Sequence, residues 1–198
     1  MDPRREPMDR LARLASNDAM TTTDHTPPLD GATGSALADA SLAHPTWEDV
    51  VRRIARRSYC VLGTSSPVHR PHSAGVLYAE ADGALYISIE RDSRKGRNIA
   101  ANAHVSVNVP IRRLPVGPPA TAMYASTAEL LPIDDPHILE LARDGRITAV
   151  TSHGELEHPA GAFVRIAPPQ VVHTYGLGLS LLTFIRNPLR AAGRVERP

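Results

Sequence analysis

Apolar and polar residues alternate over short stretches of the chain from residue 59 onward, a pattern typical of half-buried β-strands. The pair Asp82-Gly83 interrupts this pattern and predicts a two-residue hairpin turn. We therefore expect a series of short strands, at residues 59–65, 70–80, 84–89, 105–109, 121–131, 162–167 and 171–175.

Helical periodicity is limited to a few segments. Apolar residues recur at helical spacing from Trp47 to Ile54, behind the favourable N-cap Thr46, so a helix is expected to begin here and to stop around Ser58. Shorter helices are expected at residues 99–102 and 137–143. The other face of the first helix is basic and is expected to be solvated; its arginines are Arg52, Arg53, Arg56 and Arg57.

Short strands with few helices between them favour an α+β fold that is mainly β, built as a small barrel of antiparallel strands. A βαβ dinucleotide fold is disfavoured, because the helices do not alternate with the strands and no glycine-rich nucleotide fingerprint is present. Three segments lack clear periodicity: a loop at residues 111–119, an irregular region at residues 144–161, and a C-terminal part at residues 176–198 that is apolar and then basic.

Composition divides the chain into two parts. Residues 1–44 have little apolar surface to bury and are expected to form a flexible tail ahead of a folded domain at residues 45–198. The net charge of +1 excludes a general attraction to nucleic acid or membrane. No apolar run matches a membrane span or a secretory signal, so a cytoplasmic protein is expected. Cys60, the one cysteine, is expected to pack as a small hydrophobic residue.

The basic turn at residues 91–99, Arg-Asp-Ser-Arg-Lys-Gly-Arg-Asn-Ile, is the strongest candidate for chemistry. It follows a predicted strand and leads into a predicted helix, where free backbone N–H groups and the helix dipole favour an anion such as phosphate. Arg94 could add a planar fork of donors, and Lys95 a point charge. A solvated basic turn is the alternative interpretation, since most charge runs face solvent.

Further motifs accompany this turn in a fixed order. Arg-Pro-His-Ser precedes it at residues 70–73, Asn-Ala-His-Val-Ser-Val follows at residues 102–107, and Ser-Thr-Ala-Glu-Leu lies at residues 126–130. In this order and spacing, residues 46–177 resemble the FMN-binding split β-barrel superfamily, the pyridoxamine 5′-phosphate oxidase-like proteins. The segment at residues 172–177 resembles a strand ending of the actinobacterial branch that uses coenzyme F-420.

The resemblance implies a homodimer of split barrels that binds two cofactors at the subunit interface and acts on a small-molecule substrate. Arg94 and Lys95 would hold the cofactor phosphate. The full set of residues matching cofactor-binding positions is Arg70, Pro71, His72, Ser73, Ala74, Gly75, Ile87, Ser88, Arg94, Lys95, Asn98 and Thr121. His72 and Tyr175 are candidates for lining the substrate side, although a satisfied strand histidine and a packed tyrosine are the commoner explanations for such residues.

The preferred function is hydride transfer between FMN and a small organic substrate. No catalytic acid or base is assigned, because the cofactor carries the redox chemistry. The C-terminal Arg-x-His grip of the true oxidase has no match, which disfavours vitamin B6 oxidation.

Other functions remain open on the same fold. Coenzyme F-420 is the alternative redox cofactor. A haem-binding or cofactor-storage protein is a further possibility, with six histidines as candidate axial ligands: His69, His72, His104, His153, His158 and His173. No metal site is predicted, because no histidine pair has ligand spacing.

Overall fold

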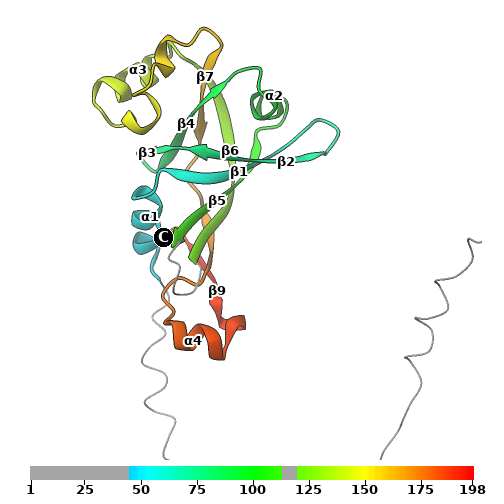
Figure 1. Ribbon diagram of the computed structural model, residues 1–198, viewed down its shortest axis with the longest axis vertical. Helices are drawn as coiled ribbons and strands as arrows, with labels where there is room; N and C mark the ends of the chain where they lie inside the picture. Colours follow the sequence, from blue (N-terminus) through cyan, green and yellow to red (C-terminus); the bar gives the residue numbers. More distant parts are fainter. Residues whose placement is uncertain (1–44, 113–119) are drawn as a thin grey trace, which may run out of the picture. The chain divides into compact units, whose positions relative to one another are not determined.

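The computed structural model describes residues 45–112 and 120–198. These residues form a curled antiparallel sheet, a half-barrel with few helices (Figure 1). Its strands are β1 (Tyr59–Ser65), β2 (Pro71–Leu77), β3 (Ala79–Ala81), β4 (Ala84–Glu90), β5 (His104–Arg112), β6 (Ala120–Pro132), β7 (Gly161–Ile166), β8 (Val171–Tyr175) and β9 (Ala192–Glu196). The helices are α1 (Trp47–Ala55), α2 (Arg94–Ala101), α3 (Pro136–Arg143) and α4 (Leu181–Arg186), with 3₁₀ turns at Thr148–Val150, Glu155–Glu157 and Pro188–Ala191.

The sheet curls for two reasons. Strand β6 changes partners along its length, and β2 and β3, which are consecutive in the chain, pair with different strands. The strand order is β2-β1-β5-β6-β7-β4-β3, with β8 beside β6 and β9 beside β8. The long strand β6 pairs with β5 over its first part and with β7 over its last. The sequence predicts one strand at residues 70–80, and this is wrong, because the structure divides the segment into β2 and β3 at Tyr78. The Tyr78 N–H donates to the carbonyl oxygen of Ser58. Beyond Tyr78 the chain leaves β1 and pairs with β4, so the two ends of the strand order are consecutive in sequence.

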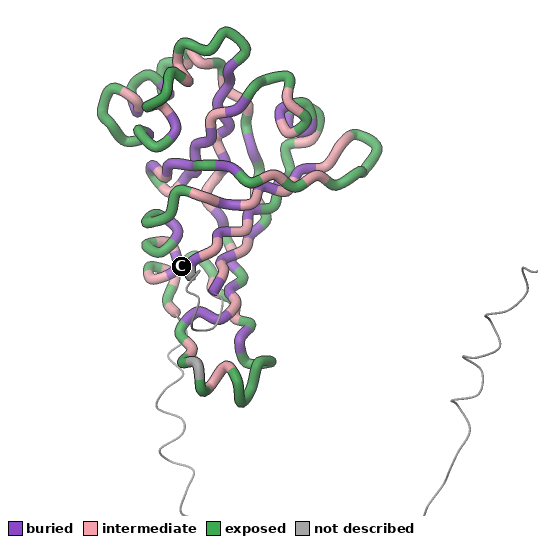
Figure 2. The backbone as a smooth tube through the Cα atoms, viewed as in Figure 1, coloured by how far each residue is buried: buried purple, intermediate pink, exposed green. Residues whose placement is uncertain are grey.

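Two apolar cores lie on opposite faces of β4. The strand itself is buried along most of its length (Figure 2). Ile87 and Leu85 face the inside of the curl, together with Leu62 of β1. Tyr86 faces the other way and packs with Phe163 of β7 and with the apolar side of α3. Because both faces of β4 are covered, this strand is a rigid support for whatever follows it in the chain.

Local signals in the sequence are confirmed at several points. Thr46 caps α1 by accepting a hydrogen bond from Asp49 N–H. Asp82 and Gly83 both have positive φ and form the predicted turn between β3 and β4. Cys60 is fully buried. Arg57, expected to be only solvated, also donates to the carbonyl oxygen of Ile111.

The structure corrects the sequence predictions at several element ends. Helix α1 ends at Ala55 rather than near Ser58. Strand β5 continues through Arg112, so the predicted loop at residues 111–119 is shorter, and its residues 113–119 lie outside the described residues. The C-terminal part contains α4 and β9, neither of which the apolar pattern indicated. The predicted tail, residues 1–44, also lies outside the described residues.

Candidate cofactor site

Helix α2 begins directly after the end of β4 and is capped by Ser93. The Ser93 Oγ accepts from Gly96 N–H at 3.3 Å and donates to the carbonyl of Glu90 at 2.6 Å. The backbone N–H groups of Arg94 and Lys95 have no hydrogen-bond partner among the described residues. The first turn carries no acidic side chain. Two free donors and the positive end of the helix dipole therefore point the same way, as an anion site requires.

Gly96 makes the turn into α2 tight. A Cβ at this position would lie 2.2 Å from the backbone oxygen of Arg91 and 3.1 Å from that of Glu90. Any side chain would push the helix start away from the strand end. Gly96 therefore holds the free N–H groups close to β4.

Asn98 anchors the buried side of α2 to the sheet. Its Nδ2 donates to Thr64 Oγ1 of β1 at 3.0 Å, and Asn98 and Thr64 are both buried. Thr64 Oγ1 in turn lies 3.5 Å from the carbonyl oxygen of His72 in β2. This chain of polar contacts ties the helix to both strands of the β1–β2 hairpin. The Asn98 amide nitrogen is thus engaged inside the protein, and its predicted contact with a cofactor stays a prediction.

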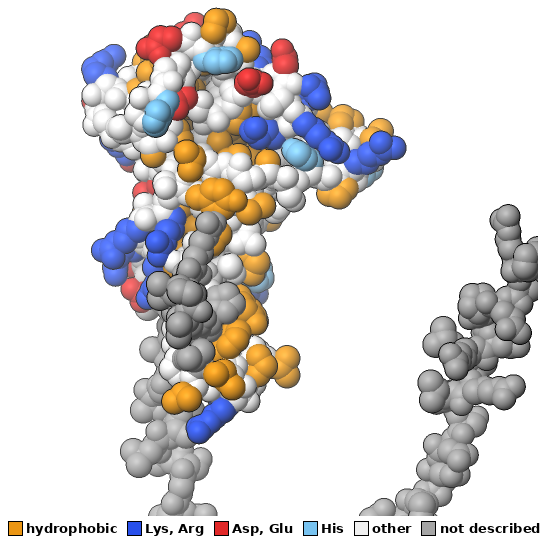
Figure 3. Space-filling view, viewed as in Figure 1, with side chains coloured by type: hydrophobic (Ala, Val, Ile, Leu, Met, Phe, Trp, Pro, Cys, Tyr) orange, Lys and Arg blue, Asp and Glu red, His pale blue; other side chains and the backbone are white. Residues whose placement is uncertain are grey.

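Positive charge gathers on the surface around α2 and the tip of the β1–β2 hairpin (Figure 3). Arg94 is exposed and Lys95 is half-buried, and neither forms an ion pair within the described ranges. Arg70 at the hairpin is likewise exposed and free of a described ion pair. Arg94 and Lys95 are therefore available to an external anion.

Strand β2 does not present its predicted residues to a single site. Ser73 and Gly75 are exposed on one face, while His72 and Ala74 are half-buried on the other, as the strand period requires. Ala74 packs against the core inside the curl. Pro71 is exposed at the strand start. The structure therefore divides the predicted segment at residues 70–75 between two faces.

Ile87 and Ser88 lie side by side in β4 but face opposite ways. The Ile87 side chain is only 1% exposed and belongs to the core, so only its backbone could reach a ligand. Ser88 is half-buried on the other face, and its residue pairs with Phe163 of β7. Ser88 therefore lies on the face of Tyr86, and its predicted contact with a cofactor stays a prediction.

Thr121 is not brought to the basic turn within one chain. It lies at the start of β6 and pairs with Tyr175 of β8. The chain leaving α2 meets β6 at Ala128, whose N–H donates to the carbonyl of Ala103. Thr121 is seven residues before Ala128, or about 20 Å along an extended strand. Thr121 and Tyr175 thus form a separate group, where β6 pairs with β8.

The open face of β1 and β5 has small residues where Gly63 pairs with Ser106. A Cβ on Gly63 would lie 2.2 Å from Ser106 Oγ, so the two strands pack closely there. On the same face, the buried Oδ1 of Asn108 has no hydrogen-bond partner in the described part of the chain. Leu77, at the end of β2, is 56% exposed. This face carries an unused acceptor and an uncovered apolar side chain.

Two of the six candidate histidines share a groove. His104 and His173 line an open hollow of about 610 Å³ together with apolar residues such as Val105 and Pro168. They pair with Thr127 and Met123, which lie four residues apart on β6, or about 13 Å. His104 lies on β5 and His173 on β8, on opposite sides of β6, so each is a separate candidate for an axial ligand. Within the described residues, no group of three His, Cys, Asp or Glu side chains could hold a metal ion.

Sequence reasoning missed two residues of this region. Thr64 was not singled out. It follows Cys60 and Leu62 in the inward-facing positions of the strand, which signals a buried hydroxyl in need of a hydrogen-bond partner. Gly96 was recognised only as part of a motif, and its close approach to Arg91 depends on the fold.

No helix in the described residues is long and apolar enough to cross a membrane.

Comparison with known proteins assigns the fold to a family. The pyridoxamine 5′-phosphate oxidase family matches residues 46–174, which is most of the chain. No curated protein matches the sequence.

Several solved structures share the fold at low identity. A haem-binding protein from Mycobacterium smegmatis is 18% identical with a TM-score of 0.56; the match covers 68% of this chain but only 56% of that one. The haem storage protein HutZ from Vibrio cholerae is 15% identical, with a TM-score of 0.53 over 65% of this chain and 94% of that one. A FAD-binding protein from Mesorhizobium loti is 23% identical, with a TM-score of 0.51 over 64% and 90% of the two chains. By its family match, the chain belongs to the pyridoxamine 5′-phosphate oxidase-like family of FMN-binding split barrels.

Proposed function

We propose that this protein is an FMN-dependent oxidoreductase that transfers hydride between the flavin ring and a small organic substrate. The observation that carries the proposal is the start of α2, where two free backbone N–H groups lie beside Arg94 and Lys95, neither of which forms an ion pair within the described residues. Family membership supports a flavin as the phosphate-bearing ligand.

The residues present fit the phosphate end of FMN. The guanidinium of Arg94 offers a planar pair of donors, Lys95 offers a compact charge, and Ser88 offers a hydroxyl on the preceding strand. The polar contacts of Asn98 and the tight turn at Gly96 hold these groups in place before the ligand arrives. A bound flavin would supply the redox chemistry, and the protein would supply position, charge and exclusion of water.

The ring end of the cofactor requires more than one chain in this proposal. Thr121 and Tyr175 lie far along β6 from the basic turn, so they would line a cofactor bound at α2 only as residues of a second copy. The exposed Leu77 on the open sheet face supports a homodimer packed through that face. Coenzyme F-420, which also carries a phosphate, is the alternative cofactor for the same basic turn.

A second candidate function is haem binding, which the groove at His104 and His173 favours. This groove is largely apolar, which suits the haem ring, and an exposed histidine lies on each side of β6. Either histidine could serve as the single axial ligand of a haem. The haem-binding and haem storage proteins that share the fold support this candidate.

The absorption spectrum of the purified protein distinguishes these functions. FMN gives two bands in the visible and near-ultraviolet, F-420 gives one, and haem gives a sharp Soret band. Titration of the cofactor-free chain with each compound should show FMN binding most tightly. Preferential uptake of F-420 or haem would replace FMN by that cofactor.

The paired substitutions Arg94→Ala and Lys95→Ala test the phosphate role. Each charge-assisted contact contributes about 1.5–3 kcal/mol, so losing both should weaken FMN binding at least about a hundredfold. The matched control is Arg186→Ala with Arg190→Ala, which removes two exposed charges in the C-terminal part and should leave FMN affinity unchanged. Equal affinity in both double variants would remove the basic turn from the site. Light scattering of the wild type and both double variants checks that the substitutions leave the oligomeric state unchanged.

A further inference from the structure

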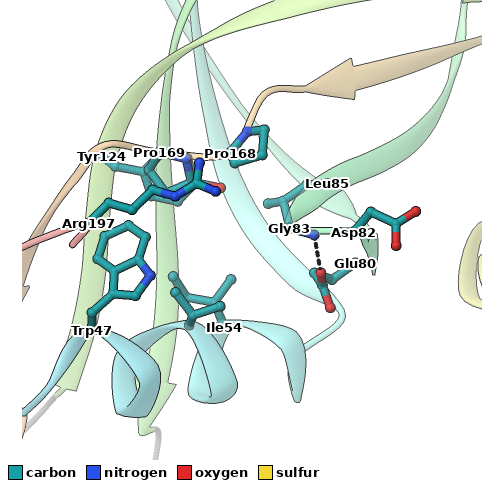
Figure 4. Close-up of a pocket in the computed structure, with 11 residues that line it drawn as sticks. Trp47, Ile54, Glu80, Asp82, Gly83, Leu85, Tyr124, Pro168, Pro169 and Arg197 are labelled. Atoms are coloured by element: carbon teal, nitrogen blue, oxygen red, sulfur yellow. Dashed lines mark hydrogen bonds between the residues drawn. The ribbon is translucent and has the colours of Figure 1, made fainter.

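A second, smaller hollow lies at the other end of β4 from the basic turn. It has a volume of about 190 Å³ and is closed on one side by α1 (Figure 4). Gly83, in the turn before β4, lines it, whereas α2 begins after β4 ends. Seven strand residues separate the two ends, or about 20 Å. The hollow is therefore distinct from the candidate cofactor site.

The walls of this hollow are mainly apolar and aromatic. Trp47 and Ile54 of α1 form one wall, Leu85 lies at the base of β4, and Pro168 and Pro169 face them (Figure 4). An apolar cavity of about 150 Å³ is large enough to hold benzene. The hollow therefore suits a ligand with one aromatic ring.

The polar groups that line the hollow without a hydrogen-bond or ion-pair partner in the described residues are donors, the Trp47 indole N–H among them. Tyr124 is only 4% exposed, and its hydroxyl has no hydrogen-bond partner in the described part of the chain although it lines the hollow. Arg197 reaches over the hollow near Trp47, and its guanidinium has no ion pair within the described residues (Figure 4).

The acidic groups nearby are already engaged. Glu80 accepts a hydrogen bond from Gly83 N–H at 2.7 Å, and Asp82 forms an ion pair with Arg146 at 2.5 Å. The Asp82 side chain also points away from the hollow (Figure 4). Glu80 keeps its charge but lies beside Gly83, at the other end of the hollow from Arg197 (Figure 4). At the Arg197 end the groups without a partner are donors and one of them is a cation, so the complementary ligand group there is an acceptor, and a negative one.

We propose that this hollow binds a small aromatic carboxylate, with its single ring packed among Trp47, Ile54 and Leu85 and its carboxylate held by Arg197 and the Tyr124 hydroxyl. The proposal does not depend on the cofactor bound at α2. It adds a second ligand site to the fold, built by α1 and the C-terminal segment.

Trp47 is the one tryptophan of the chain, so its emission reports on this hollow alone. Titration of the full chain with benzoate should change Trp47 fluorescence saturably, and calorimetry should give the same Kd. Acetate, which lacks the ring, and benzyl alcohol, which lacks the charge, should each bind at least about tenfold more weakly. Failure of benzoate to bind by either method, or equal binding of acetate, would overturn the proposal.

Two substitutions locate the bound benzoate. Tyr124→Phe removes one oxygen and should weaken binding about tenfold, while Arg197→Gln should weaken it about fivefold, because the guanidinium is exposed. Arg190→Gln, in an exposed residue that does not line the hollow, is the matched control and should have no effect. The Arg94 and Lys95 double variant should also bind benzoate normally, which separates this test from that of the cofactor site. Unchanged benzoate affinity in both Tyr124→Phe and Arg197→Gln would place the ligand elsewhere and refute this site.

Discussion

Asn98 of α2 and Thr64 of β1 share a buried hydrogen bond of 3.0 Å, and this bond joins the basic turn to the sheet. Thirty-four residues separate the two in sequence. The bond is important because α2 is short, eight residues, and so has little stability of its own. A loose α2 could not hold two free N–H groups and two cations in a fixed arrangement.

Removing this bond should destabilise the protein. Asn98→Ala leaves the Thr64 hydroxyl without its donor and should lower the free energy of unfolding by about 1–3 kcal/mol in chemical denaturation. Thr64→Val should cost a similar amount, and the double variant should cost less than the sum of the two. The control is Asn187→Ala, at an exposed asparagine whose side chain makes no hydrogen bond in the described part of the chain. Strictly additive effects would show that the two side chains do not interact.

Gly96→Ala should also destabilise the protein, although alanine favours a helix by about 1 kcal/mol relative to glycine. The added Cβ would lie 2.2 Å from the backbone oxygen of Arg91, which cannot move aside like a flexible side chain. We expect a net loss of about 1–3 kcal/mol in the free energy of unfolding, together with weaker FMN binding. Ala100→Gly, at an exposed position of the same helix, serves as the control and should cost about 1 kcal/mol without affecting the cofactor. Higher stability in Gly96→Ala would mean that the turn shifts at no cost.

The features predicted correctly from sequence are those set by neighbouring residues. The cap of α1 at Thr46 and the turn at Asp82-Gly83 each depend on chemistry within three or four residues, which a sequence shows directly. The start of α2 does not belong to this class: the sequence predicts a helix from residue 99, whereas α2 begins at Arg94, behind the cap Ser93.

The features missed are those set by pairing between distant segments. The break at Tyr78 arises because the chain changes partner from β1 to β4, and the alternation of residues 70–80 carries no sign of it. Strand β9 exists because β8 offers it an edge, so its own sequence is a weak guide. The distance of Thr121 from the basic turn likewise follows from strand registers that only the fold determines.

The turn between β3 and β4 gives a prediction about backbone strain. Gly83 has φ of +79°, a conformation that costs an L-residue about 1–2 kcal/mol. Gly83→Ala should therefore lower the free energy of unfolding by about that amount in thermal or chemical denaturation, while Glu80 can still accept from the N–H of the new residue. Gly83→Asn should be milder, because asparagine tolerates positive φ better than alanine. An alanine variant as stable as the asparagine variant would contradict the strain argument.

Alkaline pH should destabilise the protein through its buried acids. Burial raises the pKa of the Cys60 thiol from 9.0 to about 12, so between these values the unfolded chain loses this proton and the folded chain keeps it. The stability that Cys60 contributes is fully present below pH 9 and is lost as the pH rises toward 12, by up to about 1.4 kcal/mol per pH unit. Burial also raises the pKa of Tyr78 and Tyr124. The free energy of unfolding should therefore continue to fall at pH values above the ordinary pKa of tyrosine.

Chemical denaturation at a series of pH values above neutrality measures this slope. Cys60→Ala should flatten it in the range just above pH 9, where the tyrosines of the unfolded chain are still protonated, even though the variant is less stable at neutral pH because of the small cavity it creates. The native thiol should also resist thiol reagents at neutral pH and react only after unfolding, because a buried group with a raised pKa supplies almost no thiolate. Rapid labelling of Cys60 in the folded protein, or the same slope in Cys60→Ala, would show that the thiol is not held neutral by burial.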